Sequence, residues 1–86
     1  MTYRIEIAKP AAKFIRSLPA PDKERMLRAI HKLPEEGDSK QMKGVKAKGL
    51  FRLRVGDYRV IYSVDNGKLV VFVVDAGNRG QIYKRY

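Results

Sequence analysis

The segment 50–62, LFRLRVGDYRVIY, constrains the fold of this chain more than any other part of it. Two alternating runs flank Gly56-Asp57, and a two-residue turn of this kind fixes the register of a β-hairpin. The segment therefore predicts two antiparallel strands in a single register. The expected pairs, counted outward from the turn, are Val55 with Tyr58, Arg54 with Arg59, Leu53 with Val60, Arg52 with Ile61 and Phe51 with Tyr62.

The two faces of this hairpin differ in character, because side chains alternate across a strand. One face is apolar and predicts a core; it carries Phe51, Leu53, Val55, Tyr58, Val60 and Tyr62. The other face carries Arg52, Arg54 and Arg59. Like charges directly opposite one another destabilise a sheet. Three arginines on one face therefore point to an anionic ligand, and phosphate fits the guanidinium fork well.

The N-terminal half predicts one strand and two helices. Polar and apolar residues alternate over 2–7, as in a half-buried strand. Apolar residues recur at helical spacing between 11 and 18 and again between 26 and 33, and Pro10 suits a first helical turn. The link between the helices is short, so they are expected to lie antiparallel. Pro34 ends the second helix, and an acidic loop follows it.

The C-terminal half adds one more strand to the hairpin. Residues 39–49 are interpreted as a basic connection, and Asn66-Gly67 predicts a second two-residue turn. The run 69–74, LVVFVV, is typical of a central strand buried on both faces, ending at Gly77. That register places Val74 opposite Arg59. Val70 and Phe72 fall on the same face as Val74, where they would pack in the core or against an RNA base or a protein partner.

These elements predict an α+β fold in one domain, 1–86: a strand, an antiparallel helical hairpin and a three-strand antiparallel meander, all strands in one sheet. We expect the helices to cover the apolar face and the arginine face to stay open. The chain has no cysteine, so neither a disulfide nor a thiolate metal site is expected, and no cofactor is implied. No segment resembles a membrane span or a signal peptide, which favours a cytoplasmic protein.

The charge of the chain is high and uneven. The formal net charge is +10; residues 1–42 hold nine Lys/Arg against six Asp/Glu, and residues 43–86 hold ten against three. Basic charge gathered in the strand-rich half is typical of nucleic-acid binding. Lys40 is expected to contact an RNA backbone. The single histidine, His31, is expected on the surface, and Asp75 is expected to neutralise or orient a cation, with a catalytic role as the alternative.

The chain resembles the RelE/ParE toxin superfamily, on its RelE side. The resemblance covers nearly the whole chain and rests on Met42-Lys43-Gly44, the segment 51–62, the apolar strand, and Gly77-Asn78-Arg79 with Tyr83 four residues on. It implies a RelE-like fold similar to that of microbial ribonucleases. It also implies a type II toxin that cleaves mRNA in the ribosomal A site by attack of the 2′-hydroxyl, slowly without the ribosome, and is neutralised by a RelB-like antitoxin.

Carried over by position, the resemblance assigns the catalytic site to Arg52, Arg54, Arg59, Arg79 and Tyr83. Arginine stabilises a phosphorane well but stays charged, so it transfers protons poorly. Tyr83 is therefore the leading candidate for proton transfer, and Lys84 is a possible acid. The residues expected to bind RNA are Lys43, Lys46, Lys48, Lys84, Arg85 and Tyr86. The well-known relative has lysines where this chain has Arg52 and Arg54, and the family's C-terminal helix is expected to be absent or a stub.

Two alternatives are weighed against this interpretation. ParE-like members of the superfamily poison DNA gyrase and lack the cationic ribonuclease cluster. A non-catalytic protein that binds RNA or the ribosome would use the same arginines without cutting. Tyr83 separates the second alternative from the enzyme: binding is favoured if Tyr83→Phe stays toxic while Arg79→Ala does not.

Overall fold

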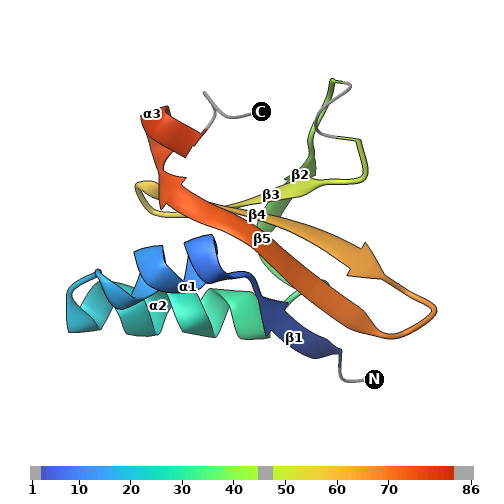
Figure 1. Cartoon of the computed structure of the whole chain (residues 1–86), viewed down its shortest axis with the longest axis horizontal. Helices are drawn as coiled ribbons and strands as arrows, with labels where there is room; N and C mark the ends of the chain where they lie inside the picture. The colour runs from blue at the N-terminus through green and yellow to red at the C-terminus, as the bar shows by residue number, and fades with distance from the viewer. Residues whose placement is uncertain (1–2, 45–47, 83–86) are drawn as a thin grey trace.

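Over its described residues, the chain forms a five-stranded sheet with the first two helices packed on one face (Figure 1). This computed structural model describes residues 3–44 and 48–82. The elements are β1 (Arg4–Ile7), α1 (Lys9–Arg16), α2 (Ala20–His31), β2 (Asp38–Gln41), β3 (Phe51–Val55), β4 (Tyr58–Asp65), β5 (Val70–Asn78) and α3 (Arg79–Ile82). The strand order is β1-β5-β4-β3-β2. Among the strand pairs of the described ranges, β1–β5 is parallel and the others are antiparallel. Within the two described ranges, no helix is long and apolar enough to span a membrane.

The hairpin of β3 and β4 has the predicted register, from Val55 opposite Tyr58 to Phe51 opposite Tyr62. Its predicted apolar face is confirmed as the core: Leu53, Val60 and Tyr62 are at most 2% exposed. The two helices contribute Ala11, Ile15, Met26 and Ile30 to the same cluster, and Leu33, just after α2, completes the expected apolar stripe. The other face, the open face, is only partly uncovered: Arg54 of β3 is exposed there, whereas Arg59 and Ile61 of β4 are buried.

The pairing of β4 with β5 differs from the prediction. A four-residue loop replaces the two-residue turn, because Asp65 pairs with Val70. The Asp65 carboxylate accepts a hydrogen bond from the Lys68 backbone N–H at 3.0 Å, and Leu69 adopts φ +56°. A β-bulge lies further along the pair, between Ile61 and Tyr62. Arg59 therefore lies opposite Gly77 rather than Val74, and β5 runs past the predicted end to Asn78.

A fifth strand, β2, forms where the sequence predicts only a loop and a basic connection. It pairs Asp38 with Arg54 and Lys40 with Arg52 along the free edge of β3. Three of its four residues are exposed, so it lacks the apolar alternation by which strands are found. Charged edge strands are common, since they discourage pairing with other chains. This strand brings two charged side chains to the open face beside the arginines.

Candidate functional site: a basic pocket on the open face

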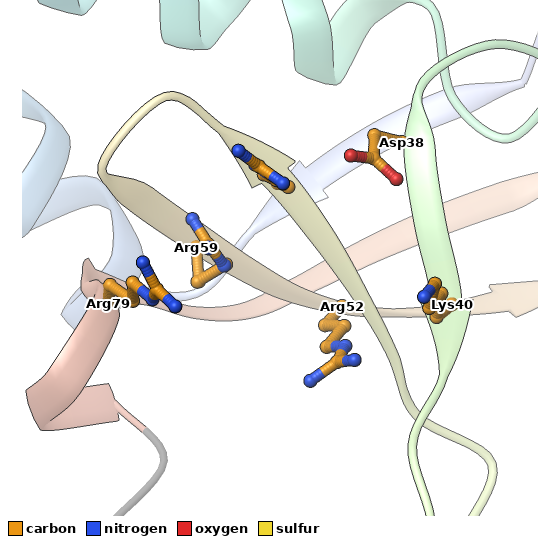
Figure 2. A pocket seen from close by; sticks show the side chains of 6 residues that line it. Asp38, Lys40, Arg52, Arg59 and Arg79 are labelled. Atoms are coloured by element: carbon orange, nitrogen blue, oxygen red, sulfur yellow. The ribbon is translucent and has the colours of Figure 1, made fainter.

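A hollow of about 200 Å3 lies on the open face of the sheet, where β2, β3 and β4 meet the start of α3. Figure 2 shows its lining, with β2 on one side and the start of α3 on the other. Five of the six described residues that line it are cations, and guanidinium groups suit phosphate oxygens in particular. We call this hollow the basic pocket; it is lined by Asp38, Lys40, Arg52, Arg54, Arg59 and Arg79.

The four arginines predicted from the sequence meet in this pocket. Arg52 and Arg54 occupy alternate positions of β3, and Arg59 lies directly opposite Arg54 on β4. Arg79 reaches the pocket from α3, which begins immediately after β5. Its backbone N–H donates a hydrogen bond to the Asp57 carbonyl oxygen at 3.0 Å. The start of α3 is therefore tied to the same turn that joins β3 and β4.

Arg59 is held more tightly than an ordinary sheet arginine. Its side chain is buried, with 7% of its surface exposed. Its Nη1 donates hydrogen bonds to the carbonyl oxygens of Gly56, at 2.9 Å, and of Tyr58, at 2.8 Å. The guanidinium group is therefore already oriented in the folded protein. A charge oriented in advance loses little freedom when it meets a ligand, which is the arrangement that stabilises a transition state best.

Helix α2 supports the turn that holds Arg59. The Tyr58 hydroxyl donates a 2.5 Å hydrogen bond to Asp22 Oδ2 near the start of α2. This bond, together with burial and the negative charge of Asp22, raises the pKa of Tyr58. Gly56 adopts φ +60°, and a Cβ there would lie 2.6 Å from Nη2 of Arg25. The turn is thus packed against α2 as well as bonded to it.

Strand β2 supplies the two pocket residues that sequence reasoning missed as members of the site. Asp38 and Lys40 are two positions apart, so both face the pocket. The only available signal was the matching alternation of Asp38-x-Lys40 and Arg52-x-Arg54, which becomes informative once the strands are known to pair. The described ranges contain no group of three His, Cys, Asp or Glu residues that could hold a metal ion.

The other predicted residues are distributed around the pocket. Lys43 lines a neighbouring groove that shares Lys40 and Arg52 with the basic pocket, so the basic surface continues along the β2–β3 connection. Lys48 is exposed on that connection and lines neither hollow. His31 is exposed, as expected. Five predicted residues lie outside the described ranges: Lys46, Tyr83, Lys84, Arg85 and Tyr86.

Asp75, for which a catalytic role was the alternative, does not line the basic pocket. It is buried, and its Oδ1 accepts a hydrogen bond from the Ala76 backbone N–H at 2.8 Å. The carboxylate in the described lining of the basic pocket is that of Asp38, on the edge strand β2.

Comparisons with known proteins agree on the family and the fold. Residues 5–83 match the family described as the ParE toxin of type II toxin-antitoxin system, parDE. The archaeal RelE–RelB complex from Pyrococcus horikoshii OT3 contains a similar chain, with 34% identity over 94% of this chain and 99% of that one, at a TM-score of 0.73. No curated protein sequence matches the chain.

Two bacterial structures share the fold at lower identity. The toxin–antitoxin complex RelBE2 from Mycobacterium tuberculosis is 20% identical over 92% of this chain and all of that one, at a TM-score of 0.77. The isolated RelE toxin of E. coli is 24% identical over 96% of this chain and 93% of that one, at a TM-score of 0.68. The predicted α+β architecture is therefore that of RelE-like proteins.

Proposed function

Since the chain belongs to the ParE toxin family of type II toxin–antitoxin systems, within the RelE/ParE superfamily, we propose that it is a RelE-type toxin that cleaves mRNA in the ribosomal A site. The observation that carries this proposal is the basic pocket, with four arginines and a lysine around one hollow. Attack by a 2′-hydroxyl adds negative charge to the phosphate, and oriented guanidinium groups stabilise that charge.

The pocket is better suited to stabilising a phosphorane than to moving protons. Arg52, Arg54, Arg59 and Arg79 serve as the phosphate clamp in this proposal, and Lys40 extends the clamp. Arginine stays charged and is a poor acid or base. We therefore expect slow cleavage by the isolated protein. Alignment of mRNA by the ribosome would supply much of the rate, since orientation is worth about 7–11 kcal/mol.

The RNA track extends from the pocket along the β2–β3 connection. Lys43 lies in the adjoining groove, and Lys48 is exposed further on. Both are proposed to contact the RNA backbone. The same role is proposed for Lys46, Lys84, Arg85 and Tyr86, and Tyr83 is proposed to take part in proton transfer. Action on ribosomes places the proposed activity in the cytoplasm.

A RelB-like antitoxin is the proposed protein partner. Several similar structures are RelE–RelB complexes, and the basic pocket offers an acidic segment five cations. Phe72 is 41% exposed on the open face and is a large hydrophobic side chain without cover in the described structure. A partly disordered acidic segment that folds on binding could bury this ring while its carboxylates meet the arginines.

The alternative that the protein poisons DNA gyrase is supported by the family match, because the matched family is described as the ParE toxin. The four-arginine pocket favours RNA cleavage, because gyrase toxins of the superfamily lack that cluster. The binding-only alternative draws on the composition of the pocket, since five cations bind RNA without transferring a proton. The experiment must therefore report cutting, and not only inhibition of translation.

Mapping of mRNA 5′ ends on programmed ribosomes tests the proposal. Primer extension would compare the wild type, Arg79→Ala, Arg16→Ala and no protein. Arg16 is an exposed arginine of α1 outside the pocket, so it matches the charge change. The backbone bond from Arg79 to Asp57 survives the Arg79 substitution. We expect new ends within the A-site codon with the wild type and Arg16→Ala only.

Two other results would redirect the assignment. A ribosome footprint without new ends would establish binding without cleavage. Inhibition of supercoiling by purified gyrase, with no effect on ribosomes, would establish the ParE-like activity. Tyr83→Phe then separates the catalytic contribution of the tyrosine from RNA binding by the arginines.

A further inference from the structure

The basic pocket contains a carboxylate that phosphate binding does not explain. Asp38 is the acidic member of its described lining. A negative charge at an anion site repels the ligand by Coulomb's law, so it weakens phosphate binding. A pocket that only bound RNA would bind more tightly with a neutral residue there.

The strand pairing places Asp38 beside the groups that would hold the phosphate. Asp38 is directly opposite Arg54, and Arg54 is directly opposite Arg59. Neighbouring strands lie about 4.7–4.9 Å apart, so the three residues form one row across the pocket. Figure 2 shows the Asp38 carboxylate turned from β2 toward the β3–β4 hairpin. A phosphate held by Arg54 and Arg59 would lie within reach of this carboxylate.

The Asp38 carboxylate is not committed to an ion pair in the described structure. Its residue is exposed, and no described lysine, arginine or histidine nitrogen lies within 4.0 Å of its oxygens. The oxygens are therefore open to an incoming ligand. The arginines around it are poor proton acceptors because they stay charged, whereas a carboxylate is a common general base.

We propose that Asp38 is the general base of the cleavage reaction, an inference that rests on the proposed function. The Asp38 carboxylate takes the proton of the 2′-hydroxyl as the 2′-oxygen forms its bond to phosphorus. The bond from phosphorus to the 5′-oxygen breaks, and the departing oxygen takes a proton from water. The products are a 2′,3′-cyclic phosphate and a 5′-hydroxyl, and Asp38 returns its proton to water.

A purely electrostatic role for Asp38 makes the opposite prediction. If Asp38 only neutralised its arginine neighbours, Asp38→Asn would strengthen RNA binding and leave the rate at saturation unchanged or higher. If Asp38 is the base, the same substitution removes the proton acceptor. The saturated rate then falls by about 10²–10⁴, the usual contribution of general acid–base catalysis, while the affinity for RNA is kept or improved.

Single-turnover cleavage on programmed ribosomes separates these two roles. The rate and the half-saturating toxin concentration would be measured for the wild type, Asp38→Asn, Asp38→Glu and Glu35→Gln. Glu35 is exposed in the loop before β2, outside the pocket lining, and its substitution makes the same charge change. We expect a fall of about 100-fold or more for Asp38→Asn alone, with Asp38→Glu retaining a rate within about tenfold of the wild type.

Each other outcome counts against the assignment. If the wild type cuts and Asp38→Asn cuts at a similar saturated rate, Asp38 is not the base, and the proposed function stands. If the wild type binds ribosomes and does not cut mRNA, both the proposed function and the assignment of Asp38 as general base are wrong. Should circular dichroism show that Asp38→Asn is unfolded, Asp38→Ser takes its place in the comparison.

Discussion

Replacing Arg59 with methionine should destabilise the fold by about 2 kcal/mol, although arginines on an open sheet face are usually dispensable. Arg59 is 7% exposed and donates hydrogen bonds to the carbonyl oxygens of Gly56 and Tyr58. Hydrogen bonds made by a charged group contribute about 1.5 kcal/mol each at the lower end, so their loss costs about 3 kcal/mol. The substitution also removes the repulsion between Arg59 and Arg54, which raises the free energy of unfolding by up to about 1 kcal/mol.

Urea denaturation followed by far-UV circular dichroism tests this estimate, because the chain has no tryptophan for fluorescence. A loss of about 2 kcal/mol corresponds to a Tm lower by roughly 8–16 °C in a domain of this size. Added salt screens the repulsion in the wild type, so the difference should widen by up to about 1 kcal/mol between low and high salt. The matched control is Arg54→Met, an exposed arginine of the same pocket. It removes the same repulsion without losing the Arg59 hydrogen bonds, so it should leave stability unchanged or raise it by up to about 1 kcal/mol.

Equal stability of Arg59→Met and Arg54→Met would refute the reasoning. So would a difference in stability between the wild type and Arg59→Met that narrows as salt is added. The result bears directly on activity assays. Because an Arg59 variant is also less stable, a loss of toxicity there would not isolate a catalytic effect, so Arg52 and Arg79 are better positions for testing catalysis.

Three further predictions follow from the turn and the pocket. Gly56→Ala should cost about 1–2 kcal/mol in urea denaturation, because φ is +60° there, and Gly56→Asn should cost less. The raised pKa of Tyr58 keeps its phenol protonated in the folded state, whereas the phenol ionises in the unfolded chain. The stability of the wild type should therefore fall as pH rises above about 10. Thermal unfolding of Tyr58→Phe should show a smaller fall over the same pH range. An equally steep fall in Tyr58→Phe would show that another group causes it. Inorganic phosphate should raise the Tm of the wild type, with a stabilisation of about 2.7 kcal/mol at a phosphate concentration 100 times its Kd. The same phosphate concentration should stabilise Arg52→Gln less, because Arg52 lines the basic pocket. Equal stabilisation of both proteins would show that phosphate binds outside the pocket.

The β3–β4 hairpin and its two faces were predictable because their information is local. Gly56-Asp57 sets the turn, and the alternation from Phe51 to Tyr62 assigns every side chain to a face. A slip by one residue would turn the whole apolar set toward solvent, so the register is strongly specified. This local alternation is sufficient to place three of the four pocket arginines on one face.

The β4–β5 register was not predictable in the same way. The run LVVFVV is apolar at every position, so a shift along the strand leaves the pattern almost unchanged. The actual shift depends on the Asp65 side chain, which bonds the Lys68 N–H, and on Leu69 in a left-handed conformation that leucine rarely adopts. The bulge beside Ile61 then moves Gly77 opposite Arg59.

Strand β2 was not predicted from the sequence because its formation depends on pairing with β3. Its residues are mostly exposed, and its charges acquire a role only beside those of β3. The sequence therefore predicted the arginines of the candidate site but not Asp38, which is now proposed as its general base. It predicted Lys40 as a contact to the RNA backbone and not as part of the pocket. Tyr83 and the basic tail lie outside the described residues, so their roles stay predictions.

The arrangement of charge in the pocket connects the proposed substrate to the proposed partner. Arg54 and Arg59 oppose each other across β3 and β4 and repel. Asp38 lies opposite Arg54 on the other side, but it makes no ion pair within 4.0 Å among the described residues, so its compensation is partial. An anion that enters the pocket lowers the repulsion between these two guanidinium groups, whether it is an RNA phosphate or a carboxylate of an acidic segment. An antitoxin that occupies these guanidinium groups would therefore compete with mRNA for the same electrostatic relief, and it would neutralise the toxin without having to distort the sheet that holds them.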